Sequence, residues 1–173
     1  MLREGFQPSR NEWDCLGDGV YFFEDAPIHA WDWAREQHGS EAAVLQADVQ
    51  LRDCVDLKDI GWSRFLADVY DRFLAASKAK GIPLPTQTAE THRLDREVIN
   101  FAVGILEANG QAVASVRGVF LEGGPAFPES FLFEKAHVQV AVRDVSMISN
   151  CRAIPPPALA GTTGPLLQTT PQI

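Results

Sequence analysis

Apolar residues recur at three- and four-residue spacing in two long segments, and this period predicts amphipathic helices. The first helix is expected over residues 61–80, with Gly81 directly after it. The second is expected over about residues 95–108, with Asn109 and the next glycine as its stop. The inner faces of these helices carry Trp62, Phe65, Leu66, Val69, Phe73, Leu74 and Ala75 in the first, and Val98, Ile99, Ala102, Ile105 and Leu106 in the second.

Shorter apolar runs predict strands and one further helix. The strands are expected directly after Gly19 and over residues 43–51, 54–57, 114–120 and 136–143, where 54–57 is interpreted as a second piece of the 43–51 strand. A helix should follow the first strand from Pro27 to about His38, because Asp25 can cap it and proline suits the first helical turn. Residues 122–134 are expected to form the loop between the last two strands.

The last predicted strand alternates between two kinds of side chain. Val138, Val140 and Val142 share one face, and His137, Gln139, Ala141 and Arg143 share the other. We expect the valine face to be core and the other face to meet a cleft or solvent.

Too few helices alternate with the strands for a regular βαβ series, so the predicted class is α+β. A chain of 173 residues fits one domain, which we place at residues 1–152. Residues 153–173 are rich in proline, glycine and threonine without periodicity and are expected to be disordered.

Charge and composition exclude several classes of protein. The net charge of −8 argues against a nucleic-acid grip based on phosphate neutralisation. No apolar run approaches a membrane span and no signal sequence is recognised, so a cytoplasmic, non-membrane protein is predicted. Cys15, Cys54 and Cys151 match neither a disulfide framework nor a zinc site, and no metal is expected.

The segment most suggestive of chemistry begins at Gly17-x-Gly19-Val-Tyr21 and continues into an aromatic helix with Trp31 and Trp33. Glycines permit a close backbone approach, and a flat ring beside them can grip a planar ligand. A turn before a core tyrosine is the alternative interpretation. The two tryptophans are two residues apart on a helix and should point apart, one into the core and one toward a pocket.

This block resembles the second signature of the ADP-ribosyltransferase superfamily, in the poly(ADP-ribose) polymerase and diphtheria-toxin-like branch. The resemblance implies two small antiparallel sheets that form a cleft for NAD, with flanking helices. Tyr21 would then stack on nicotinamide, Gly17 and Gly19 would leave room for it, Trp33 would floor the pocket, and Ser9 would contact the distal ribose.

Residues 137–144 resemble the final catalytic strand of one subgroup of this superfamily, in which glutamine stands where others have glutamate. The resemblance therefore assigns the role of holding the ribose hydroxyls to Gln139. Glutamine supplies no negative charge for the transition state, so an acid beside the preceding loop, Glu122 or Glu134, would have to contribute it. An exposed strand glutamine without function is the alternative.

The first signature of the superfamily, a His-Gly strand, is not found, because its expected place lies before residue 1 of this sequence. None of the four histidines stands at its place in chain order, although His137 can reach the cleft if it shares a face with Gln139. Without that strand, the tyrosine strand should present an unpaired edge that could support a homodimer.

Two functions follow from the resemblance, and a third remains open. The first is an NAD-dependent ADP-ribosyltransferase, of a toxin or phage-conflict kind, that modifies a protein or nucleic-acid acceptor and releases nicotinamide. The second is a catalytically inactive domain of the same fold that binds a ligand or partner. An unrelated α+β interaction domain is the third.

Overall fold

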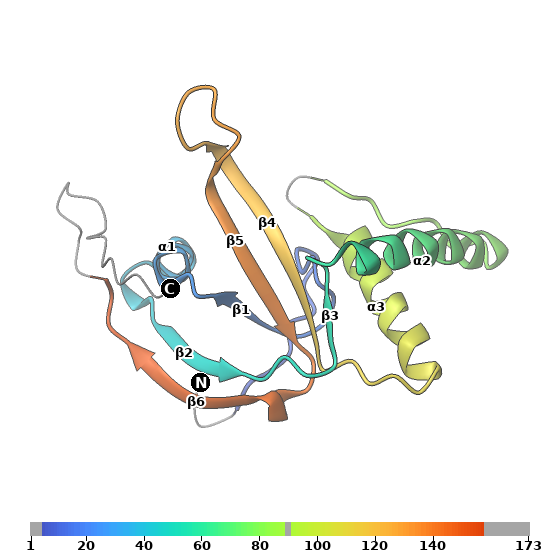
Figure 1. Ribbon diagram of the computed structural model, residues 1–173, viewed down its shortest axis with the longest axis horizontal. Coiled ribbons are helices and arrows are strands. Elements are labelled where there is room, and N and C mark those ends of the chain that lie inside the picture. The colour runs from blue at the N-terminus through green and yellow to red at the C-terminus, as the bar shows by residue number, and fades with distance from the viewer. Residues whose placement is uncertain (1–4, 89–90, 158–173) are drawn as a thin grey trace, which may run out of the picture.

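The computed structural model describes residues 5–88 and 91–157, and in these ranges the chain forms two sheets and three α-helices (Figure 1). The architecture is therefore α+β, as predicted. Among the described residues, no helix combines the length and the apolar character that crossing a membrane would require.

The larger sheet has four strands in the order β1-β5-β4-β3. β1 (Val20–Glu24) is antiparallel to β5 (Phe133–Val142), which is antiparallel to β4 (Ser115–Pro125). β3 (Cys54–Asp56) runs parallel to β4, so the expectation of purely antiparallel sheets is wrong for this pair. The tyrosine-bearing strand β1 stands at the edge of the sheet; dimerisation through this edge remains a prediction.

The parallel pair follows from its connection. The chain leaves β3 through α2 (Ile60–Ala79) and α3 (Arg93–Ala108) before it enters β4, and a crossover of this length permits parallel pairing. Both helices were predicted to within two residues, because their apolar stripes pack on each other and on the sheet. The segment 54–57, expected to continue the preceding strand, instead joins the other sheet.

The second sheet pairs β2 (Val44–Val49) with β6 (Ile148–Ile154) in antiparallel fashion. β6 was not predicted. It also overturns the boundary placed at residue 153, because Ala153 and Ile154 are paired strand residues opposite Leu45 and Val44. Residues 158–173 of the predicted tail lie outside the described part of the chain.

The four-stranded sheet is buried on both faces near the end of β5. On the helix face, which carries Tyr21, Val116 and Ala141, the side chains pack toward α3. On the opposite face, Val140 and Val142 pack against residues of β2 and of the segment around β6. The expectation that only one face of β5 is core is therefore wrong for this half of the strand.

Two local predictions at the ends of elements are also corrected. α1 (Pro27–His38) begins after Ala26, and Asp25 does not cap it but adopts φ = 49°, which turns the chain from β1 into the helix. The β4–β5 hairpin is longer than predicted, because Glu122 to Pro125 continue β4 and only residues 126–132 form the loop. Figure 1 shows this hairpin projecting beyond the rest of the molecule.

Candidate functional site

A polar cluster lies on the helix face of the sheet, where the β4–β5 hairpin begins to leave the core. Its members are Gln139, His137, Glu122 and His29. Gln139 on β5 pairs across the strands with Phe23 on β1 and with Gly118 on β4. Cross-strand partners share a face, so Phe23 lies beside Gln139 on one side. On the other side stands Gly118, whose lack of a side chain lets Leu16 pack closely over β4, since a Cβ at this position would lie 2.9 Å from the Leu16 side chain. His137 is two residues along the same face, and its ring centroid is 5.3 Å from that of Phe23.

Glu122 reaches His137 by the diagonal geometry of the hairpin. His137 pairs with Phe120, and Glu122 is two residues farther along β4, so long side chains at these positions can meet. The Glu122 carboxylate Oε1 lies 3.9 Å from His137 Nε2. The side chain of Glu122 is 50% exposed, whereas that of His137 is 1% exposed. The pair therefore runs from solvent into the interior.

Helix α1 adds a second histidine and an indole to this cluster. The turn at Asp25 directs the helix back over β1, so the His29 ring lies 4.6 Å from Phe23 and 4.1 Å from His137, centroid to centroid. Trp33, one turn later, is 48% exposed and lies 6.4 Å from Phe23. Trp31 on the other side of the helix is buried, so the prediction that the two tryptophans point apart is confirmed.

The hydrogen bonds of His137 indicate which of its two ring nitrogens carries a proton. Nδ1 lies 3.1 Å from the carbonyl oxygen of Lys135, which can only accept, so Nδ1 carries the proton. Nε2 then presents a lone pair, and the side-chain amide of Gln139 donates to it at 2.9 Å. Burial, and secondly the neighbouring His137, lower the pKa of His29, so the His29 ring is neutral at pH 7.

Tyr21 has a different environment from the one expected of a stacking residue. Its ring packs against the main core cluster. Its hydroxyl donates to the carbonyl of Gly17 (2.8 Å) and accepts from the backbone N–H of Leu16 (2.9 Å). Tyr21 thus ties the preceding loop to β1, two strand positions from Phe23.

Gly17, Gly19 and Ser9 gather at the other end of β1 from Trp33. Gly17 has φ = 79°, and a Cβ there would lie 2.7 Å from Oδ1 of Asn100. Gly19 lies against Ala141 and forms a backbone bridge with Ser9. The glycines therefore allow close packing of backbone against α3 and β5. Among the residues predicted to share one site, Gln139 and Glu122 belong to the polar cluster and Trp33 lies next to it. Gly17, Gly19 and Ser9 lie apart from it.

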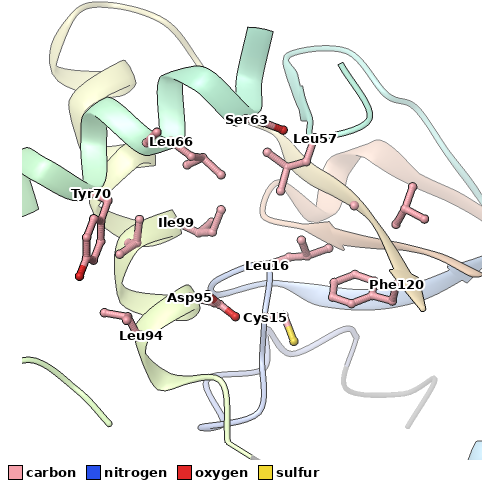
Figure 2. A pocket seen from close by; sticks show the side chains of 14 residues that line it. Cys15, Leu16, Leu57, Ser63, Leu66, Tyr70, Leu94, Asp95, Ile99 and Phe120 are labelled. Carbon is pink, nitrogen blue, oxygen red and sulfur yellow. The ribbon is translucent and has the colours of Figure 1, made fainter. Parts of the chain in front are cut away.

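An apolar groove of about 560 Å³ adjoins the cluster. Figure 2 shows it between α2 and α3 on one side and Leu16, Leu57 and Phe120 on the other. Phe120 belongs to both regions, because its ring also stacks on His137 at 5.8 Å. Burial raises the pKa of the Cys15 thiol in this groove to about 12, so it remains protonated and unreactive.

Sequence reasoning missed His29 as a member of the site. The place of His29 in the sequence gives no sign that it contacts His137 or lies near Glu122. The contact exists because the turn at Asp25 folds α1 over the sheet. The β4–β5 register would have revealed the diagonal between Glu122 and His137. The two imidazoles, the carboxylate and the amide can bind hydroxyl groups or a cation, and the exposed indole can stack on a planar ring. No family model matches the chain, and comparison with curated proteins and with solved structures finds no significant match.

Proposed function

We propose that the chain is an ADP-ribosyltransferase-like domain that binds NAD and transfers its ADP-ribose with release of nicotinamide. The observation that supports this most strongly is the pairing of the two strands that carry the resemblance. β1, with the Gly-x-Gly-Val-Tyr block, is the hydrogen-bonded neighbour of β5, so Phe23 stands opposite Gln139. Segments far apart in the sequence therefore contribute to one surface.

The groups around Gln139 suit the two halves of nicotinamide riboside. Trp33 offers a half-exposed indole for stacking on the nicotinamide ring, and the Gln139 amide can bind ribose hydroxyls. Glutamine supplies no negative charge, but the Glu122 carboxylate is 3.9 Å from the histidine that Gln139 contacts. Glu134 instead lies beside the hairpin turn, where it accepts from the N–H of Gly124. Glu122 is thus the favoured acid.

Nicotinamide release from NAD by the full chain tests this proposal. Gln139→Ala should lower the rate by about 10²-fold, as loss of one placed polar group does at preorganised sites. Gln139→Glu should keep or raise it, because a carboxylate stabilises positive charge developing on the ribose. Gln111→Ala, a change at an exposed glutamine outside the site, is the matched control. A rate unchanged by Gln139→Ala would overturn the assignment of this residue.

A binding domain without catalysis is the second candidate. The engaged Tyr21 hydroxyl favours it, because this ring is held in the core rather than free to stack. NAD binding measured by calorimetry separates the two candidates: binding without nicotinamide release supports the second, and binding with release supports the first. If the parent chain shows neither, both NAD-based functions are wrong.

A further inference from the structure

We propose that His29, Glu122 and His137 form a binding site for one Zn²⁺ ion. The ligand atoms of these three side chains all lie within 4.8 Å of one another. Around a tetrahedral zinc ion with bonds near 2.0–2.1 Å, neighbouring ligand atoms are about 3.3 Å apart. The three groups therefore need only small side-chain rotations to reach a common ion. This inference is independent of the proposed NAD chemistry.

The donor set matches the preferences of zinc. Two imidazoles and one carboxylate are a recurrent set of three protein ligands for Zn²⁺, with the fourth position left to water. A purely oxygen-binding ion such as Mg²⁺ or Ca²⁺ would find one carboxylate here and two nitrogen ligands that it does not favour. The mixed nitrogen and oxygen donors of the cluster thus favour an ion of intermediate hardness such as Zn²⁺.

The surroundings of His137 are those of an oriented metal ligand. Its Nδ1–H donates to the backbone carbonyl of Lys135, which fixes the ring and leaves Nε2, 3.9 Å from the Glu122 carboxylate, as the nitrogen available to a metal. Phe23 and Phe120 pack against the rings and form an apolar wall around the donors. An apolar wall excludes water and strengthens the attraction between a cation and its ligands.

Gln139 competes with the ion for one of its ligands. Its amide donates to His137 Nε2 at 2.9 Å, so a metal must displace this hydrogen bond. Gln139→Ala should consequently tighten zinc binding several-fold. The same substitution is expected to abolish most nicotinamide release, so the metal site and the proposed function give opposite responses and can fail independently.

The probe is Zn²⁺ alone, titrated into the full chain after chelator treatment in competition with a chromophoric chelator. One ion per chain is expected. His29→Ala and Glu122→Gln should each weaken binding by at least about 10²-fold, since loss of a mere supporting partner costs 10- to 100-fold. His38→Ala, on the same helix, and Glu134→Gln, on the same hairpin, are the matched controls and should bind as the parent does.

Two measurements keep the result decisive. Glu122→Gln changes a half-exposed side chain, and far-ultraviolet circular dichroism should show it folded without metal. Co²⁺ substituted for Zn²⁺ should give the visible bands of a tetrahedral nitrogen and oxygen site without a thiolate charge-transfer band. Zinc affinity that survives both ligand substitutions, or that falls equally in the controls, overturns the site. A thiolate band, or no binding at micromolar zinc, does so as well.

Discussion

Removal of the Tyr21 hydroxyl should destabilise the fold while leaving its aromatic ring in place. In Tyr21→Phe, the backbone N–H of Leu16 loses its acceptor and the carbonyl of Gly17 loses its donor. Leu16 is only 2% exposed, so water has little access to the N–H that is left behind. Burial raises the pKa of Tyr21, so the hydroxyl is protonated at neutral pH and fills both hydrogen-bonding roles.

The magnitude follows from the two groups left without partners. An unsatisfied buried donor or acceptor costs about 1–3 kcal/mol, and the partial burial of this pair places the total near 2–3 kcal/mol. For a domain of 150–250 residues, each kcal/mol lowers the melting temperature by about 2–4 °C. Tyr21→Phe should therefore melt about 4–12 °C below the parent.

Thermal and urea unfolding monitored by circular dichroism measure this loss. Tyr70→Phe is the matched control, because Tyr70 lines the groove and its hydroxyl forms no hydrogen bond to another described residue. If Tyr21→Phe unfolds at the same temperature as this control, the hydroxyl does not hold the loop and the reasoning fails. Because the ring remains, NAD affinity measured on the same variant reports the stacking role separately from the structural one.

Two further changes probe charged groups in the sheet and the preceding loop. Arg117→Met should lower the free energy of unfolding by about 2–3 kcal/mol, because the guanidinium, 14% exposed, donates to the carboxylates of Glu24 and Asp56. If the losses of unfolding free energy caused by Arg117→Met and Glu24→Gln simply add in the double mutant, the two side chains do not interact and this reasoning is wrong. Burial raises the pKa of Asp14, so the folded state favours its protonated form. The parent should therefore gain stability relative to Asp14→Asn as the pH falls from 7 toward 4, and urea midpoints that move in parallel would refute this.

The sequence predicted the helices well because their burial is periodic over many residues. It missed β6 for a physical reason: Ile148, Cys151 and Ile154 are spaced by three rather than two. Asn150 between them adopts φ = 51°, and the pairing with β2 shifts register between Gln46 and Asp48. An irregular strand of this kind has no alternating pattern to detect.

In the β4–β5 hairpin the sequence predicted a loop where the structure has a strand. Gly123, Gly124 and Pro125 are typical of a loop, yet they continue β4, since a register shift between Glu122 and Pro125 accommodates them. Local composition indicates where the chain can bend, but the cross-strand partner decides whether pairing continues. The same limit explains why the segment 54–57 was assigned to the wrong sheet.

The candidate site likewise contains residues that the sequence indicated and residues that only the folded structure brings in. Trp33 and Gln139 were assigned to the site by the resemblance, and in the structure both lie beside Phe23. The shared face of Gln139 and His137 follows from strand alternation and is confirmed by their hydrogen bond. The position of His29 beside His137 depends on the positive φ at Asp25, and the spacing of apolar residues along the sequence gives no information about this angle.

One ring nitrogen links the two proposals for this site. His137 Nε2 has a single lone pair, which can accept from the Gln139 amide or bind a cation, but cannot do both. The observed position of Gln139 and a metal-bound His137 are therefore alternatives. Occupation by zinc would free the Gln139 amide and also engage Glu122, the acid favoured to assist it. If both proposals hold, the metal and the ADP-ribosyl chemistry compete for the same side chains, and zinc acts on this site as an inhibitor.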